Sequence, residues 1–197
     1  MKIKNKIISL FASVAIISCA AATNVFAQTK NFVGASLGVS YASAGGSVKI
    51  DDGDAVEVGA NDNVFGLDFL YGVQADNKFV VGFGATYDLT NQDMGSGGGY
   101  TLKAKDHYSI YVAPTYVLNE NSALFLKAGY HKVKGELGGY SENFSGWGYG
   151  AGMKFMLDKN LYVQAELQRV NYGSETGGGA SIEPTSSAGI ISIGHKF

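Results

Sequence analysis

The stretch GIISIGHKF (189–197) places apolar residues at alternating positions up to the last residue of the chain. Terminal segments of soluble domains are usually polar and frayed, because ordering them contributes little. A strand that stays regular to its end is typical of a sheet that closes upon itself. In lipid such closure is required, since an unpaired edge amide has no water to bind. We therefore expect this segment to pair with the first strand.

The same two-residue period continues through the chain from residue 30 onward. It predicts eight strands of about ten residues, the length that a tilted strand needs to cross a bilayer. Short connections are expected near residues 74–78, 119–122 and 156–160, and long ones near 42–63, 90–105, 132–146 and 173–186. Short turns at one end and long loops at the other are typical of outer-membrane barrels.

The two faces of these strands differ in residue size. One face carries Phe, Tyr, Trp, Leu and Val, whereas the other is mostly Gly, Ser, Ala and Thr. A soluble barrel would bury its large residues, which would leave an outer surface of small ones. We expect the apolar face to contact lipid, with aromatic residues gathered at both membrane interfaces. The predicted girdles are Tyr41, Phe65, Tyr87, Tyr108, Tyr130 and Trp147 near the long loops, and Tyr71, Phe79, Tyr116, Phe155 and Phe197 near the short turns.

The first 27 residues have the pattern of an export signal. Three lysines precede an apolar run over residues 7–22, and Val25-Phe26-Ala27 followed by Gln28 fits a small-residue cleavage site. We expect cleavage after Ala27, leaving residues 28–197 as the barrel domain. The alternative is lipoprotein processing at Cys19, the only cysteine, which would acylate that residue.

Loss of the signal also removes Lys2, Lys4 and Lys6, leaving 12 basic against 17 acidic residues, a net charge of −5. This balance argues against a nucleic-acid partner.

Three segments resemble strands of known outer-membrane proteins. LFLKAGY (124–130), GWGYGAGMKF (146–155) and LYVQAELQRVNYG (161–173) are similar to the opacity-type porins and to the transmembrane domain of outer membrane protein A. The terminal Phe197 after an alternating strand resembles the signal read by the barrel assembly machinery. That resemblance implies recognition of the outward-facing residues Ile191, Ile193, His195 and Phe197.

Four charged residues have inward parity on the predicted strands: Asp68, Lys127, Lys154 and Glu166. Opposite charges in a narrow lumen should pair. The resemblance to outer membrane protein A implies a salt-bridge plug or gate; the alternative is a static filling of the lumen. Pro114, in the middle of a strand, removes one donor and predicts either a bulge or a missing bond.

Sites for other chemistry are weak in this sequence. His107 and His131, with Asp88 and Asp106 as neighbours, lie near the loop rim, where some barrel enzymes place catalytic groups. Their spacing matches no such enzyme. The acidic stretch DDGDAVEVGANDN (51–63) lacks the ligand spacing of an EF-hand and is read as a solvated loop. We expect no enzymatic activity, cofactor or metal.

Together these features predict an all-β protein: an eight-stranded, antiparallel, up-and-down transmembrane barrel in the outer membrane of a Gram-negative bacterium, with periplasmic termini. We expect a structural or surface-interacting role, with loops that contact host or cell-surface ligands and at most a narrow, charge-plugged pore. A passive small-solute porin is the alternative, because the glycine-rich inner face leaves room for water. A barrel enzyme is a more distant one. The sequence does not decide the oligomeric state.

Overall fold

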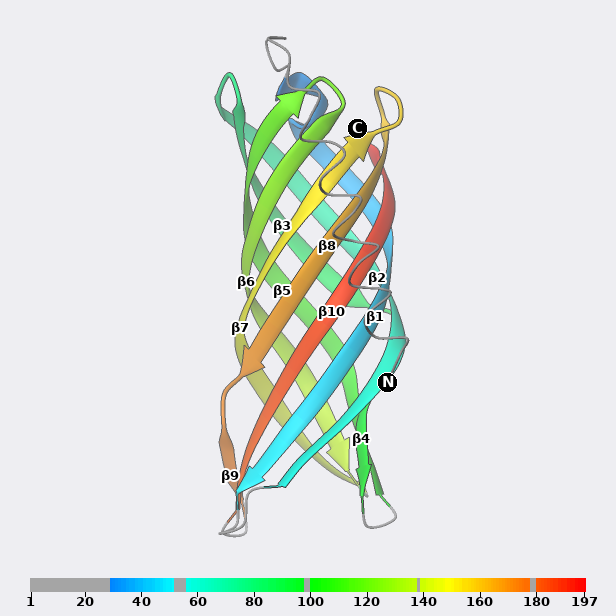
Figure 1. Cartoon of the computed structure of the whole chain (residues 1–197), viewed down its shortest axis with the longest axis vertical. Helices are drawn as coiled ribbons and strands as arrows, with labels where there is room; N and C mark the ends of the chain where they lie inside the picture. Colours follow the sequence, from blue (N-terminus) through cyan, green and yellow to red (C-terminus); the bar gives the residue numbers. More distant parts are fainter. Residues whose placement is uncertain (1–28, 52–55, 98–99, 138, 178–179) are drawn as a thin grey trace, which may run out of the picture.

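The computed structural model describes residues 29–51, 56–97, 100–137, 139–177 and 180–197. The described residues form a tall barrel of tilted strands, with the turn η1 at one end (Figure 1). The predicted export signal, its cleavage site and Cys19 lie outside the described residues. The elements are η1 (Thr29–Asn31), β1 (Gly34–Asp51), β2 (Val56–Asp76), β3 (Phe79–Asp88), β4 (Gln92–Gly97), β5 (Tyr100–Asn119), β6 (Ser122–Leu137), β7 (Tyr140–Met156), β8 (Leu161–Tyr172), β9 (Glu175–Gly177) and β10 (Ala180–Lys196).

Within the described part of the chain, eight strands close an antiparallel barrel, as the sequence predicts. Each pairs with its neighbours in chain order, and β10 returns to pair with β1 through Val39 and Ile193. The two short strands add no position to the circle: β4 pairs with β5 beyond the end of β3, and β9 pairs with β10 beyond the end of β8. No helix of the described residues is long and apolar enough to span a membrane.

The predicted long loops are wrong in their extent. β1 and β2 stay paired from Gly34 and Gly72 out to Ile50 and Val56, and β6 and β7 stay paired out to Leu137 and Tyr140. β2 is 21 residues long, about twice what a membrane crossing needs. These segments are rich in Gly, Ser and Asn, a composition typical of loops. A continuous partner strand nevertheless satisfies their backbone hydrogen bonds, as it does for an apolar strand. We call the end that carries these hairpins the outer end; it is at the bottom of Figure 1.

The outer surface is apolar, which confirms the predicted orientation of the strands. Leu37, Ile110 and Leu126 are 45%, 63% and 62% exposed although they belong to regular, paired strands. Aromatic side chains meet across strands at two levels. The ring centroids are 5.2 Å apart for Tyr41 and Phe65, near the middle of β1 and β2, and 5.0 Å apart for Phe79 and Tyr116, near the short turns. Such a surface is stable in lipid and would not be in water.

Pro114 interrupts the sheet without shifting it. Paired positions on β5 and β6 pass from Val112 and Ala128 to Thr115 and Phe125 in one register, so the expected bulge is wrong and an interrupted ladder is found. The register of this pair shifts instead between Lys105 and Tyr108. Asp106 lies in that bulge with a φ of 50°.

Candidate functional site in the barrel lumen

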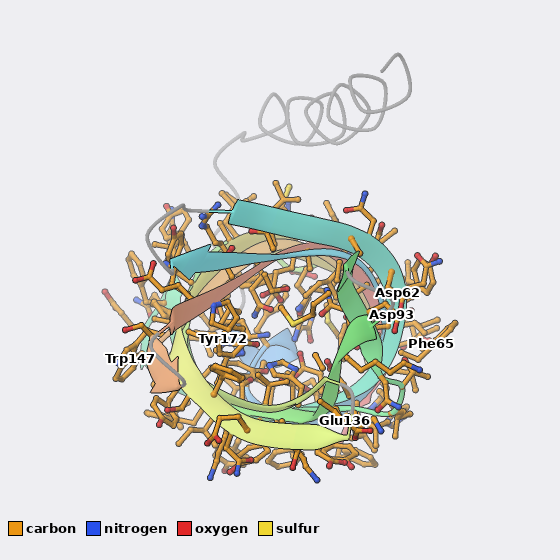
Figure 2. The ribbon with its side chains drawn as sticks, turned by 90° about the horizontal axis from the view of Figure 1, so that it is seen from below. Asp62, Phe65, Asp93, Glu136, Trp147 and Tyr172 are labelled. Carbon is orange, nitrogen blue, oxygen red and sulfur yellow. The ribbon has the colours of Figure 1, made fainter. Side chains whose placement is uncertain are left out.

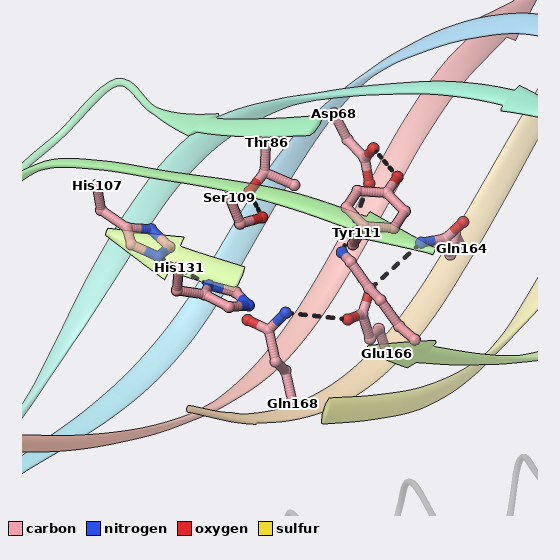
Figure 3. Close-up of polar contacts among 10 residues, drawn as sticks. Asp68, Thr86, His107, Ser109, Tyr111, His131, Gln164, Glu166 and Gln168 are labelled. Atoms are coloured by element: carbon pink, nitrogen blue, oxygen red, sulfur yellow. Dashed lines mark hydrogen bonds and ion pairs between the residues drawn. The ribbon is translucent and has the colours of Figure 1, made fainter. Parts of the chain in front are cut away.

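Lys127 on β6 forms the centre of a buried charge cluster. Its Nζ lies 3.3 Å from Glu166 Oε2 on β8 and 4.0 Å from Asp68 Oδ2 on β2. The three residues are between 4% and 8% exposed. β6 and β8 are separated by β7, and β2 lies farther around the barrel, so the cluster joins strands across the lumen (Figure 3). We call Asp68, Lys127 and Glu166 the central cluster.

Neutral side chains complete the hydrogen bonding of the central cluster. The hydroxyl of Tyr111 donates to Asp68 Oδ1, and Lys127 Nζ lies 4.1 Å from the centre of the Tyr111 ring. Gln164 and Gln168 donate to the two oxygens of Glu166 at 3.5 and 3.4 Å. Buried carboxylates with several donors keep their charge far more readily than isolated ones.

Lys154, the fourth predicted lumen charge, lies apart from the central cluster. Its side chain is buried, and its Nζ lies 4.2 Å from the centre of the Tyr162 ring. Among the described residues, no carboxylate approaches it within 4.0 Å. The structure therefore brings together three of the four predicted charges, and a cation–π contact takes the place of an ion pair at the fourth.

A second polar chain lies nearer the outer end. His107 Nδ1 donates to Asp88 Oδ2 at 2.7 Å, and His107 Nε2 lies 3.0 Å from His131 Nδ1, with the two rings stacked. Asp106, the other predicted neighbour, is exposed and hydrogen-bonds to neither histidine. Ser109 pairs with His131 across the strands, but its hydroxyl bonds to Thr86 at 2.6 Å.

Buried apolar side chains cluster inside the barrel near both ends, and the sequence did not predict these clusters. At the end with the short turns, η1 brings Phe32 into the barrel mouth. We call this inner cluster the inner seal, and the one at the outer end the outer seal. The inner seal consists of Phe32, Val80, Val117, Ala123, Met156 and Tyr162, and the outer seal of Met94, Ala104, Val133, Phe144, Val170 and Tyr172.

The alternation of the sequence could have revealed these seals. Three large residues of the seals have inward parity: Phe144, Tyr162 and Tyr172. Tyr111 and Phe125, elsewhere in the lumen, have the same parity, so the expectation of a mostly small-residue inner face is wrong at these positions. Figure 2, which views the barrel from the outer end, shows Tyr172 inside the wall and Trp147 and Phe65 outside it. The inner face is therefore mixed, with large residues filling the space that glycines leave.

Little free volume remains between the seals. A cavity of about 60 Å³ lies between the outer seal and the central cluster, and one of about 20 Å³ lies between the central cluster and the inner seal. These volumes hold a few water molecules.

The acidic stretch and the terminal residues take part in other contacts. The carboxylate of Asp62 accepts from the backbone amides of Asn63 and Asp93, and so ties β2 to β4 (Figure 2). Within the described residues, no group of three or more His, Cys, Asp or Glu could hold a metal ion. The predicted assembly residues lie on the lipid face, all of them exposed: Ile191, Ile193, His195 and Phe197.

A closed antiparallel barrel with an apolar outer surface and a filled lumen defines the class of transmembrane β-barrels. The chain matches the family described as outer membrane protein beta-barrel domain over residues 9–194, and it belongs to that family. Its place is therefore the bacterial outer membrane, and the predicted resemblance to outer-membrane barrel proteins is confirmed.

Several solved structures share this fold. The attachment invasion locus protein Ail of Yersinia pestis, solved with the heparin analogue sucrose octasulfate, is 18% identical with a TM-score of 0.51, over 84% of this chain and 100% of that one. OprG of Pseudomonas aeruginosa is 13% identical with a TM-score of 0.51, over 88% and 99% of the two chains. The outer membrane protease OmpT of Escherichia coli is 9% identical with a TM-score of 0.51, over 83% and 96%. A search of curated proteins finds no match.

Proposed function

We propose that this protein is a non-conducting outer-membrane barrel that acts at the cell surface, structurally or through ligands bound by its outer hairpins. The observation that supports this most directly is the filled lumen. Two apolar seals flank the central cluster, and the two cavities beside that cluster total only tens of cubic ångströms. The alternative, a passive porin, requires a continuous aqueous path through these layers.

Single-channel recording tests this proposal. The mature chain is refolded into planar bilayers after a heat-dependent gel shift has shown that it is folded. We expect no conductance steps. Discrete steps that change when Lys127 is replaced by Gln would contradict the proposal and identify a gated pore.

A basic patch on the outer hairpins is the surface that we propose for ligand binding. Lys105 pairs with Lys134 across β5 and β6, and Lys103 pairs with Glu136. Lys105 Nζ lies 2.7 Å from Glu136 Oε2. The hydrogen bond from Lys105, together with the charges of Lys105, Lys134 and Lys103, lowers the pKa of the Glu136 carboxyl. Because Ail was solved with a sulfated saccharide, anionic saccharides are the first class to test.

The test of this patch is heparin binding to the refolded barrel. We expect Lys134→Gln and Lys132→Gln to weaken binding, and Lys159→Gln, in a turn at the opposite end, to leave it unchanged. Equal effects of all three variants would show that only net charge matters.

We propose that the Asp88–His107–His131 chain is structural rather than catalytic. A hydrolase needs a nucleophile and a base that substrate can reach, but Ser109 and His131 are each 1% exposed. Peptide and phospholipid hydrolysis by the purified barrel should be absent. Activity that disappears in His131→Ala would overturn this conclusion.

Export and assembly complete the proposal. We propose cleavage after Ala27, which an intact mass of the mature protein would show; an acylated Cys19 would give a different mass.

We also propose insertion by the barrel assembly machinery, to which the exposed lipid-facing row from Ile191 to Phe197 is suited. Phe197→Ala should slow assembly in cells.

A further inference from the structure

An open apolar groove crosses the outer face of the barrel over β5, β6, β7 and β8. Its volume is about 660 Å³, within the range of sites that hold small ligands. The residues that shape it include Pro114, Leu126, Ala128, Ala151, Leu167 and Arg169. A smooth barrel wall would present no such depression, so the groove needs a local cause.

Small residues between large ones create the groove. Ala151 on β7 pairs with Leu126 on one side and with Leu167 on the other, so a methyl group lies between two isobutyl groups. In the next row toward the outer end, Ala128 lies between Val112 and Tyr149. The alanines form the floor and their larger partners form the walls, a shape that fits a linear hydrocarbon chain.

Arg169, the only arginine of the chain, lines the outer part of this groove. It is exposed on the lipid face, and its cross-strand partners Tyr149 and Ser187 are uncharged. Its Nε donates to Asn171 Oδ1 at 3.3 Å, and no other hydrogen bond to the described residues occupies the terminal guanidinium nitrogens. A cation on the lipid face is unfavourable unless it lies at the interface and meets an anion.

Arg169 lies at the level of the outer interface. Asn171, the next outward-facing residue on β8, pairs directly with Trp147 of the outer aromatic girdle. Lipid phosphates lie at this depth, and a guanidinium binds phosphate through two parallel hydrogen bonds.

We propose that this groove binds a phosphorylated lipid of the outer leaflet, with an acyl chain between Leu126 and Leu167 and a phosphate on Arg169. The apolar groove and the arginine at its outer part are complementary to the two ends of such a molecule. The proposal does not depend on whether the lumen conducts or on what the outer hairpins bind.

Trp147, the only tryptophan, provides the test. Its side chain projects from the barrel wall (Figure 2), two residues from Tyr149 on the same face. The full mature barrel is reconstituted in vesicles of bromine-labelled phosphatidylcholine, which quenches the fluorescence of Trp147, and unlabelled lipid A is then titrated in. We expect fluorescence to recover at a lower fraction of lipid A than random mixing predicts.

Two variants with matched controls locate the binding. In Arg169→Gln the preference for lipid A over phosphatidylcholine should fall about tenfold, the usual effect of losing a charged hydrogen bond. Lys159→Gln, which removes a charge in the turn between β7 and β8 at the opposite end of the barrel, should retain the preference. Ala151→Phe should fill the groove and also abolish the preference, whereas Ala85→Phe on the lipid face of β3 should not.

Several outcomes would overturn the proposal. The first is fluorescence recovery that follows random mixing in the unmodified barrel. The second is an equal loss of the lipid A preference in Arg169→Gln and Lys159→Gln, and the third is an equal loss in the two phenylalanine variants. Reversal of the lipid A effect by inorganic phosphate would show a soluble anion rather than a lipid at Arg169. Each variant is first shown to be folded by its heat-dependent gel shift.

Discussion

Lys127 shows how one side chain can hold several strands of a barrel together. Its ammonium group is the single cation close to two buried carboxylates, Asp68 and Glu166, among the ion pairs of the described residues. A buried ion pair contributes little net stability compared with an apolar filling, because desolvation opposes it. Removing only one partner is different, since the remaining charge is then buried without compensation.

Lys127→Met should therefore lower the free energy of unfolding by about 3–5 kcal/mol. The double variant with Glu166→Gln should recover part of this loss, because it removes one of the two stranded charges. Urea titrations in lipid vesicles, followed by tryptophan fluorescence, measure both. If Lys127→Met changed neither stability nor conductance, the central cluster would be no plug.

Asp158, in the turn between β7 and β8, is a residue whose charge stabilises local structure. Its Oδ1 accepts from the backbone amides of Asn160 and Leu161, each at 2.7 Å, and these bonds lower the pKa of the carboxyl. A carboxyl with a lowered pKa stabilises the fold above its ordinary pKa and loses that contribution as the pH falls through its folded value.

Asp158→Ala should accordingly be less stable than the unmodified barrel at neutral pH, and the difference should disappear in strong acid. Unfolding midpoints measured between neutral pH and about pH 2 would show this. Asp76→Ala, next to the turn between β2 and β3, is the control variant. It shows whether the loss of any carboxylate near a turn has the same effect on stability. A difference that stays constant with pH would contradict the role of the charge.

At the scale of the element, η1 seals the inner end of the barrel because a glycine on β2 makes space for it. A Cβ placed on Gly72 would overlap the carbonyl oxygen of Phe32. The ring of Phe32 then packs among Val80, Val117 and Tyr162. A short turn with little internal stability is thus held by the packing of Phe32 and by the hydrogen bond from Asn31 Nδ2 to the carbonyl oxygen of Glu120 at 2.8 Å.

Phe32→Ala should cost about 3 kcal/mol of unfolding free energy, since the vacated space is enclosed by protein. Phe83→Ala, on the lipid face, should cost less, because lipid chains fill the space that it leaves. Equal losses would show that Phe32 is not enclosed. Amide exchange of residues 29–33 should also become faster in the Phe32 variant only.

At the scale of the whole molecule, closure of the barrel depends on a close approach at the seam between β10 and its neighbours. A Cβ on Gly194 would overlap the Tyr162 ring and lie 2.7 Å from the carbonyl oxygen of Leu37. β8, β10 and β1 therefore meet at a position where only glycine fits. Gly189, on the same strand, has no atom nearer than 3.9 Å to an added Cβ.

Gly194→Ala should reduce the fraction of protein that shows the heat-dependent gel shift, and Gly189→Ala should leave that fraction unchanged. The physical reason is that a strained seam exposes backbone amides to lipid. An unchanged folded fraction in Gly194→Ala would mean that Tyr162 can move aside at little cost.

The sequence by itself determined the barrel, the face that meets lipid and the inward parity of Asp68, Lys127, Lys154 and Glu166. These properties follow from a two-residue period, which is local and is set by the geometry of a strand. Composition alone does not predict how far the paired strands of the outer hairpins continue, because pairing depends on the neighbouring strand.

Only the tertiary structure decided which inward side chains meet. Lys127 contacts Glu166 and Asp68 but not Lys154, and Phe32 reaches the inner seal from outside the strands. Those contacts depend on the register between strands distant in sequence and on the tilt that closure imposes. A local pattern gives the direction of each side chain, whereas its height in the barrel, and so its partner, is a property of the closed sheet.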